Sequence, residues 1–279
     1  MKLIKPQFNI WEQPAGLEGI YKQIERAGRV CYKSEDKITE DSAKSFVDRM
    51  VKSGHGAMLE HGTVYLAIPI TTKHSGQSEI RYMDNKYSVV RESTGFTMKD
   101  DLGDECNCWC VTTNYRVLVE NGWLDDLQYL CEPTEFHEKR ICVRYTSDIH
   151  FYKDCTRHRV FSWAIESTRF CNYIKQKFGS SITFATPIWL KEEEQEEFEE
   201  DLKTIESIYF KWINKGWQPQ QAAYFLIQGT KAEIIMTGFA SDYNHFFDLR
   251  SEIAKTGKPH PTVVELVEPL RQEFIKRGY

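Results

Sequence analysis

The sequence predicts a mixed α/β fold, because segments with helical periodicity alternate with strand-like runs along its 279 residues. Residues 63–70 form a near-continuous apolar run rich in β-forming residues, which predicts a buried strand. Residues 141–146 alternate between apolar and polar side chains and predict a second strand. Apolar residues make up 41% of the chain and charged residues 28%, a balance typical of globular proteins that bury a large core.

Two helices are expected before the first strand, at residues 17–27 and 41–53. The second of these helices should bury an apolar side made of Phe46, Met50 and Val51.

After the second strand, Ser147 or Asp148 can serve as the N-cap of a helix that runs to about residue 159. This prediction places the Arg-His-Arg sequence at 157–159 in the last turn, where the helix dipole favours cations. A loop is expected at 161–173, followed by a short strand at 182–187.

The last third of the chain predicts helices with one apolar side. Below the acidic stretch at 192–201, apolar residues recur at steps of three and four. They are Phe198, Leu202, Ile205, Tyr209 and Trp212. Pro219 opens another helix, residues 233–237 lead into a helix that ends at Arg250, and Pro261 starts the last helix. The inward residues of that helix are expected to be Val264, Leu266, Val267, Leu270 and Phe274.

Residues 74–140 differ from the rest and are interpreted as an insertion with a small fold of its own, including a helix near 114–120. Cys106-x-Cys108-x-Cys110 suggests a zinc site, but alternate residues of a strand also point the same way. No further ligand pair stands at a familiar spacing nearby, so we expect a strand and no metal.

Composition argues against several classes of protein. A formal net charge of -5 is unlike that of a general nucleic-acid binder, although a local basic pocket can still hold a small anion. No run approaches the ~20 apolar residues that span a membrane. The first residues lack the apolar core of a signal peptide, so we expect a cytoplasmic protein with reduced cysteines. Neither a Gly-rich dinucleotide fingerprint nor a P-loop occurs.

The segment 157–170 is the strongest functional signal in the chain. It reads Arg-His-Arg-Val-Phe-Ser-Trp-Ala-Ile-Glu-Ser-Thr-Arg-Phe and so combines three guanidinium groups with a histidine and hydroxyls. Guanidinium forks match phosphate oxygens, and hydroxyls add further donors, so the segment predicts a site for a nucleotide or dinucleotide. The alternative is a charged helix end followed by an ordinary loop.

This segment resembles the signature of the flavin-dependent thymidylate synthases, Arg-His-Arg-x-x-Ser-x-Asn-Glu-x-Ser-x-Arg-Tyr. The residues that match it are Arg157, His158, Arg159, Ser162, Ser167 and Arg169. Ala164, Ile165 and Phe170 stand where the signature has Asn, Glu and Tyr. Ala223 also departs, because the family often has a phosphate-binding Arg there.

Other segments resemble the same family in the same order. Residues 24–32 are similar to its opening helix, and 55–65 to its Glu-His element before a strand. Residues 230–237, followed by 245–250, resemble its C-terminal helix with a His-x4-Arg ending, and His260-Pro261 closes the match. The resemblance implies a single domain over residues 1–279, with a central, mostly antiparallel sheet flanked by helices and an insertion at about 74–140.

The resemblance also implies ligands and assembly. The reaction would convert dUMP to dTMP with FAD as cofactor and with NADPH and methylenetetrahydrofolate as co-substrates. The active sites would be shared between the subunits of a homotetramer.

By the same resemblance, individual residues receive roles. FAD would contact Arg157, His158, Arg159, His61 and His245. Ser167, Thr168, Arg169 and Glu166 would hold dUMP, with Arg169 on its phosphate and Arg250 on its uracil edge. The catalytic residues would be Arg250, Ser167 and His61, where Ser167 acts as a phosphate or base contact and not as a nucleophile.

Several alternatives remain open at the level of sequence. The departures suit a related pyrimidine-nucleotide C5 hydroxymethylase, a methylase with a changed substrate such as a cytosine nucleotide, or a non-catalytic nucleotide-binding homologue. His61 and His245 could be core histidines, Arg250 a helix-end cation, and Arg29 a simple ion-pair partner.

Overall fold

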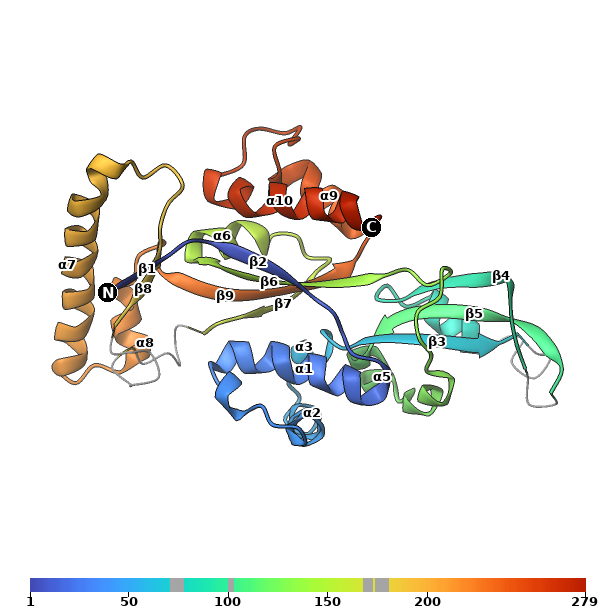
Figure 1. Cartoon of the computed structure of the whole chain (residues 1–279). Helices are drawn as coiled ribbons and strands as arrows, with labels where there is room; N and C mark the ends of the chain where they lie inside the picture. Colours follow the sequence, from blue (N-terminus) through green and yellow to red (C-terminus); the bar gives the residue numbers. More distant parts are fainter. Residues whose placement is uncertain (71–77, 100–102, 168–172, 174–180) are drawn as a thin grey trace.

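The computed structural model describes residues 1–70, 78–99, 103–167, 173 and 181–279, and Figure 1 shows their arrangement. Thr168, Arg169 and Phe170, which belong to the predicted nucleotide-binding segment, lie outside the described residues.

The main sheet has four strands in the order β2-β6-β9-β7, and all neighbouring strands are antiparallel. The strands are β2 (Gln7–Trp11), β6 (Arg140–Asp148), β9 (Lys231–Phe239) and β7 (Ser162–Ile165). The predicted strand at 141–146 is confirmed as part of β6. The mixed α/β class with a mostly antiparallel sheet is therefore confirmed.

Helices cover both faces of this sheet (Figure 1). Because side chains alternate along β9, Ile235 packs with Ala27 and Val30 of α1 (Gly16–Tyr32) on one face. Ile234 and Met236 belong to the core on the other face. That core is closed by α6 (Ile149–Cys155), α9 (Asp242–Arg250) and α10 (Pro261–Arg277).

The N-terminal helices agree with the predictions, although α1 is longer than expected. The second predicted helix is α2 (Ser42–Lys52), in which Phe46 and Met50 are buried. Val51 is 40% exposed, so the prediction for it is wrong, and the buried valine of this helix is Val47, one turn earlier. The short α3 (Gly56–Leu59) then leads to the predicted strand β3 (Thr63–Pro69).

Residues of the predicted insertion extend β3 into a second sheet with the order β3-β5-β4. Its strands and helices are α4 (Ser78–Met83), β4 (Val89–Lys99), β5 (Glu105–Asn114) and α5 (Tyr115–Asn121). Tyr115 and Leu118 of α5 share a hydrophobic cluster with Ile20 and Ile24 of α1. The segment thus adds to the body of the protein and does not fold apart from it, while the single-domain assignment stays a prediction.

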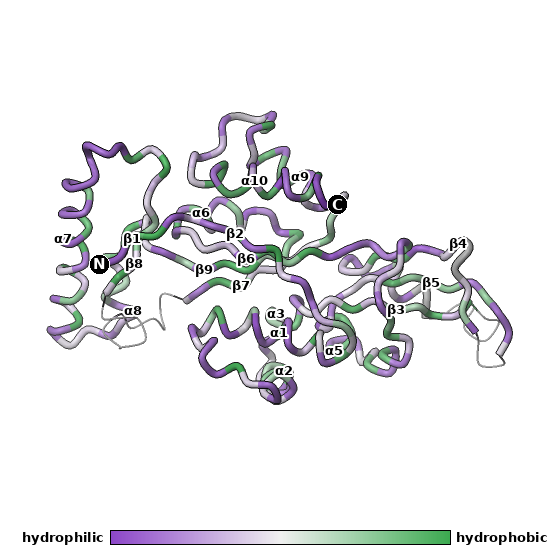
Figure 2. Tube along the Cα trace, viewed as in Figure 1, coloured by the Kyte–Doolittle hydropathy of each residue, from purple (hydrophilic) through white to green (hydrophobic). Residues whose placement is uncertain are grey.

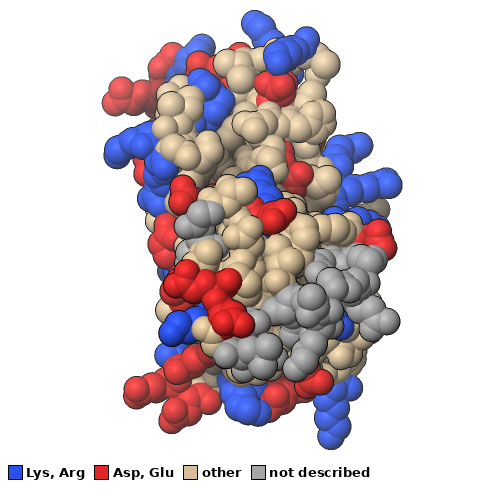
Figure 3. All heavy atoms as spheres, turned by 90° about the vertical axis from the view of Figure 1, so that its right-hand side faces the viewer, with Lys and Arg blue, Asp and Glu red and all other residues tan. Residues whose placement is uncertain are grey.

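The expected helix near 114–120 is confirmed as α5, whose N-cap Asn114 accepts a hydrogen bond from the Val117 amide. Cys106, Cys108 and Cys110 lie at alternate positions of β5, as a strand requires. No group of three or more potential metal ligands occurs among the residues that the structure describes. Figure 3 views the end of the molecule formed by β3, β4 and β5, where acidic and basic side chains are both scattered over the surface.

A third unit lies at the opposite end, where β1 (Lys2–Ile4) pairs in parallel with β8 (Thr183–Ala185), which confirms the predicted strand. The long helix α7 (Gln195–Asn214) buries Leu202 and Tyr209 and is followed by the short α8 (Pro219–Ala222). Figure 2 shows α7 as largely hydrophilic, in agreement with its acidic outer side. None of the described helices combines the length and apolar character needed to cross a bilayer.

The structure corrects the prediction for the Arg-His-Arg segment. Asp148 caps α6 as expected, but the helix ends at Cys155, so residues 157–159 lie beyond its last turn. Part of the predicted loop at 161–173 is the strand β7, because Ser162–Ile165 pairs with β9 at the edge of the main sheet. The chain must leave the helix early to reach that edge.

Two further corrections concern the C-terminal part. By resemblance, residues 230–237 belong to a C-terminal helix, but here residues 231–237 lie in the strand β9, and only Asp242–Arg250 is helical. β9 is rich in buried β-branched residues, which favours a strand between two neighbours. In α10, Leu266, Val267, Leu270 and Phe274 are buried as predicted, whereas Val263 replaces Val264 as the inward valine.

We predict that Gly19→Ala destabilises the protein. A Cβ at Gly19 would lie 1.8 Å from the Pro14 carbonyl oxygen, so the backbone of the N-terminal segment or α1 would have to move. We expect a loss of about 1–3 kcal/mol in the free energy of unfolding, measured by denaturant titration. The matched control is Gly229→Ala, whose Cβ would meet only Ile227 Cδ1 at 3.7 Å. Equal stability of the two variants would contradict the packing described here.

Candidate nucleotide and flavin site

The three motif residues in the turn after α6 differ in their exposure to solvent. Arg157 and Arg159 are exposed, whereas His158 between them is only 8% exposed. The turn is fixed by its backbone, since the His158 amide donates to the Cys155 carbonyl oxygen at 3.1 Å. The Trp163 indole donates to the His158 carbonyl oxygen at 3.3 Å. Two exposed arginines therefore flank a buried imidazole.

The His158 ring packs against α9. Its centroid lies 5.0 Å from that of Phe246 and 6.0 Å from that of His245, which is exposed. Burial lowers the pKa of His158 to about 4, and the neighbouring Arg250 adds to the shift. The imidazole is therefore neutral near pH 7 and can donate or accept a hydrogen bond without adding charge.

Arg250 joins the same cluster from the last residue of α9. Its Nη2 donates to the Asp154 carbonyl oxygen at 3.1 Å, which ties α9 to the end of α6. Its Nε is buried and makes no hydrogen bond within the described part of the chain. The Arg250 guanidinium, whose Nε–H is available to a ligand, thus lies beside the neutral His158.

Glu166 and Ser167 are held at the end of β7. The Glu166 amide donates to the Glu233 carbonyl oxygen at 2.8 Å, and its Oε2 accepts from Lys231 Nζ at 2.7 Å. The Ser167 amide donates to the Cys31 carbonyl oxygen of α1 at 3.1 Å. Because the Glu166 carboxylate is paired with Lys231, it is fixed in place.

Glu233 completes this ion network from β9. It lies 2.8 Å from both Arg144 Nε and Lys231 Nζ and accepts from the Thr146 hydroxyl at 2.9 Å. Burial alone would raise the pKa of Glu233, but the hydrogen bonds and charges of Arg144 and Lys231 lower it to about 2. The network therefore joins β6, β9 and the end of β7.

His61 lies on the other face of the main sheet, away from His158. Its side chain is fully buried, and its Nδ1 is 2.8 Å from the Thr237 hydroxyl of β9. Thr237 shares the α1 side of β9 with Ile235, whereas His158 packs on α9. Burial and the nearby Arg140 guanidinium lower the pKa of His61 to about 3, so it too is neutral near pH 7.

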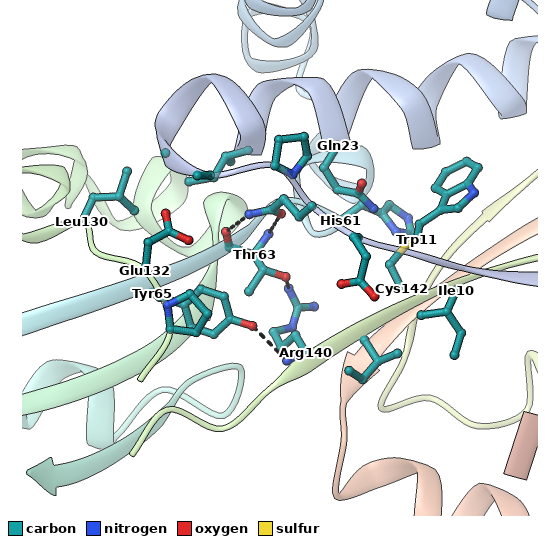
Figure 4. A pocket seen from close by; sticks show the side chains of 18 of the residues that line it. Ile10, Trp11, Gln23, His61, Thr63, Tyr65, Leu130, Glu132, Arg140 and Cys142 are labelled. Carbon is teal, nitrogen blue, oxygen red and sulfur yellow. Dashed lines mark hydrogen bonds between the residues drawn. The ribbon is translucent and has the colours of Figure 1, made fainter. Parts of the chain in front are cut away.

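A cavity of about 140 Å³ opens beside His61 (Figure 4). It lies between the N-terminal segment, α1 and the starts of β3 and β6. Gln23, Arg140 and Cys142 contribute polar or sulfur atoms to its wall. The sequence did not single out Gln23 or Arg140, and no motif marks them.

The structure brings some predicted residues together and separates others. Arg157, His158, Arg159, His245 and Arg250 form one cluster, while Glu166 and Ser167 form another at the end of β7. The Arg29 guanidinium pairs with Glu25 at 2.8 Å, which confirms the ion-pair alternative. Lys231 and Glu233 were missed, although their spacing on a strand that also bears buried apolar residues was a signal.

Comparison with known proteins tests the resemblance. Residues 132–261 match the family model described as thymidylate synthase complementing protein. A flavin-dependent thymidylate synthase from Corynebacterium aurimucosum is 31% identical over 89 residues. Part of the chain is therefore similar to the flavin-dependent thymidylate synthases, over the residues that these two matches cover. The family match includes the Arg-His-Arg motif, β9 and α9, but it does not reach the resemblance at residues 24–32 and 55–65.

The aligned part is short, covering 31% of this chain and 36% of the Corynebacterium relative, so the chain matches about a third of that protein's length. Two solved structures of the UMP/dUMP methylase PolB from Streptomyces cacaoi, bound with 5-Br dUMP and with 5-Br UMP, are also similar. They are 14% and 12% identical, with a TM-score of 0.45 in each case. The alignments cover 99% of this chain and 93% and 92% of those chains.

We predict that His158 makes the stability of the protein depend on pH. Its pKa of about 4 in the folded state lies below the ordinary value of 6.5, so the unfolded chain takes up a proton first. The free energy of unfolding should therefore fall as the pH drops from about 6.5 to about 4.

The variant His158→Gln removes this contribution. The stability difference between wild type and variant should shrink by as much as about 3 kcal/mol across that range, as measured by urea titration at several pH values. Parallel curves for the two proteins would show that the imidazole is not kept neutral by the fold.

Proposed function

We propose that this protein is a flavin-dependent thymidylate synthase, which converts dUMP to dTMP with methylenetetrahydrofolate, NADPH and FAD. The observation that supports this most is the cluster at the end of α6. There, the exposed Arg157 and Arg159 flank the neutral His158, which lies beside Arg250. The similarity to the flavin-dependent thymidylate synthases suggests the reaction, and the cluster supplies groups suited to a dinucleotide and an anionic ring.

The cluster fits FAD in its chemistry. Arg157 and Arg159 offer unburied guanidinium forks for a pyrophosphate, and His158 and His245 offer ring edges for contact with a heterocycle. The buried Nε of Arg250 lacks an acceptor in the described residues, which suits a ligand oxygen. When bound, FAD would supply the hydride chemistry of the reaction.

The nucleotide dUMP would be held at the end of β7. We assign Ser167, Thr168 and Arg169 to its phosphate or base, and Arg250 to the uracil edge. A fixed cation at that edge stabilises negative charge as it develops on the ring oxygen. Glu166 acts indirectly. Its ion pair with Lys231 fixes the end of β7 and thereby the position of Ser167, the next residue.

His61 belongs to the proposed flavin site but lies across the sheet from His158. This separation favours active sites shared between subunits of a homotetramer, in which the cavity beside His61 of one copy faces the motif of another. We propose such an assembly for this protein and place it in the cytoplasm.

A second candidate function keeps the fold and changes the substrate or product. Ala164 is 1% exposed and packs against Ala27 and Val30, so no polar group is available where the family signature has Asn. Ile165 on the opposite side of β7 packs on the other core. Because Ala164 and Ile165 replace two polar residues of the signature, the alternative function is hydroxymethylation in place of methylation, or a cytosine nucleotide in place of dUMP as substrate.

We predict that the purified protein binds FAD, turns yellow and releases tritium from 5-tritiated dUMP when all substrates are present. Arg157→Ala and Arg159→Ala should each weaken FAD binding by about 10-fold, because each removes a charge-assisted contact. The control is Arg49→Ala, an exposed arginine on α2, which should bind FAD as the wild type does.

The mass of the nucleotide product then separates a methyl from a hydroxymethyl group and a uracil from a cytosine base. A protein that fails to bind FAD at tens of micromolar would contradict the proposed function.

We predict that two inactive variants complement each other. If sites are shared between copies, mixing His61→Ala with Arg250→Ala chains creates some sites in which both residues are intact. Random assembly should restore about a quarter of wild-type turnover per site. Refolding the two variants together, against each variant refolded alone, measures this gain. A protein that sediments as a monomer and is fully active under the same conditions would contradict shared sites.

A further inference from the structure

The cavity beside His61 holds a buried polar side chain that the proposed function does not use. Gln23 lies on α1 and is only 2% exposed, and it lines this cavity (Figure 4). Neither its Oε1 nor its Nε2 has a nitrogen or oxygen hydrogen-bond partner among the residues that the structure describes, and the Cys142 thiol is the one weak partner beside the amide. Buried amides are almost always hydrogen-bonded, so an amide without partners calls for an explanation.

The residues around Gln23 hold its side chain next to the cavity but do not provide strong hydrogen-bond partners for its amide. Ile20 and Ile24, its neighbours on α1, belong to a fully packed apolar cluster, which fixes the rotation of the helix. Cys142 of β6 faces Gln23, but a thiol is a weak partner, and burial raises the pKa of Cys142 to about 11. The amide therefore presents a strong donor and a strong acceptor to the cavity.

Arg140 adds a positive charge to the same wall. Its Nη1 donates to the Glu60 carbonyl oxygen at 3.0 Å and lies 3.4 Å from the Thr63 hydroxyl. These acceptors are neutral oxygens and do not cancel the charge of the guanidinium. Gln13 fixes the same strand end, because its side-chain amide exchanges two hydrogen bonds with the Thr63 backbone. The wall is thus rigid on the side that carries Arg140.

These groups define the chemistry of a ligand. A glutamine amide offers an N–H donor beside a C=O acceptor, and a cyclic amide, or lactam, offers the same pair in reverse. A phosphate would leave the Gln23 carbonyl facing an anion, so it does not fit. A carbonyl oxygen near Arg140 would be favoured by the positive charge. We propose that Gln23 and Arg140 form a subsite for the lactam edge of a planar heterocycle.

The size of the cavity limits what enters it. At about 140 Å³ it is smaller than the roughly 300–1,000 Å³ of pockets that enclose whole drug-sized ligands. It can take one end of a ring system, while a sugar or phosphate stays outside. Uracil, flavin and pterin rings all carry a lactam edge, and the choice among these three rests on the proposed function.

The test compares wild type with Gln23→Met, which keeps the length of the side chain and removes both hydrogen-bonding groups. Binding of dUMP, FAD and methylenetetrahydrofolate is measured separately by calorimetry. The ligand whose ring enters the subsite should bind at least about 10-fold more weakly to the variant. The melting temperature of the unliganded variant should be unchanged or higher, because a buried amide without partners has been removed.

A purely structural role for Gln23 would give the opposite pattern, a lower melting temperature with unchanged affinities. Gln220→Leu, at an exposed position on α8, is the matched control and should leave all three affinities unchanged. If Gln23→Met does not fold, Gln23→Glu provides the second variant, because it keeps the shape and loses the donor.

The outcome for the subsite can be separated from the outcome for the proposed function. If wild type binds none of the three substrates, the proposed function fails, and the free rings uracil, lumichrome and pterin are then tested at millimolar concentration by ligand-observed NMR. Binding of any ring that is lost in Gln23→Met supports the subsite. Binding of no ring, or equal binding by both proteins, overturns it and leaves a cavity that holds only water.

Discussion

The ion network on β9 is the interaction on which the arrangement of the molecule depends. Glu233 binds Arg144 of the neighbouring strand and Lys231 of its own strand, and Lys231 in turn binds Glu166 after β7. A buried carboxylate is tolerated only when charges and hydrogen bonds surround it, and for Glu233 they come from β6 and β9. Since the Ser167 amide also donates to the Cys31 carbonyl oxygen of α1, the network ties the sheet, this helix and the chain that follows β7 together.

Both buried histidines of the site are kept neutral, and this leaves the arginines as the local source of charge. His158 lies beside Arg250, and His61 lies near Arg140. If either imidazole were protonated, it would repel its arginine in a poorly solvated place. In each place a guanidinium therefore lies beside a neutral imidazole, which supplies shape and hydrogen bonding without adding a second charge.

Local signals in the sequence predicted the elements that local interactions determine. The 3.6-residue period gave α2, α7 and α10, and Asp148 identified the start of α6 through its capping hydrogen bond. The strand β7 was missed because four residues carry little pattern, and its partner β9 lies about 70 residues further along the chain. The ion network was missed for the same reason, since Glu166 and Lys231 meet only in the folded sheet.

The family signature predicted which residues cluster around α9, but not on which face of the sheet each one lies. His61 and His158 separate because His61 follows α3 and contacts Thr237, whereas His158 follows α6 and contacts Phe246. Gln23 carries no signal at all, because a glutamine on an amphipathic helix is usually a surface residue. Its significance appears only when the helix is packed and its amide is left without a partner.

The inserted segment bears on the site through β3. The Cys131 amide donates to the Tyr65 carbonyl oxygen at 3.0 Å, and His137 Nε2 lies 3.0 Å from the Leu66 carbonyl oxygen. These contacts hold the outer edge of β3, while β5 holds its other edge along seven residue pairs from Thr63 to Pro69. A strand bound on both edges cannot shift its register by one residue without breaking both sets of hydrogen bonds. Because His61 and Thr63 stand at the start of that strand, the insertion fixes the wall of the cavity that the main sheet alone would leave open.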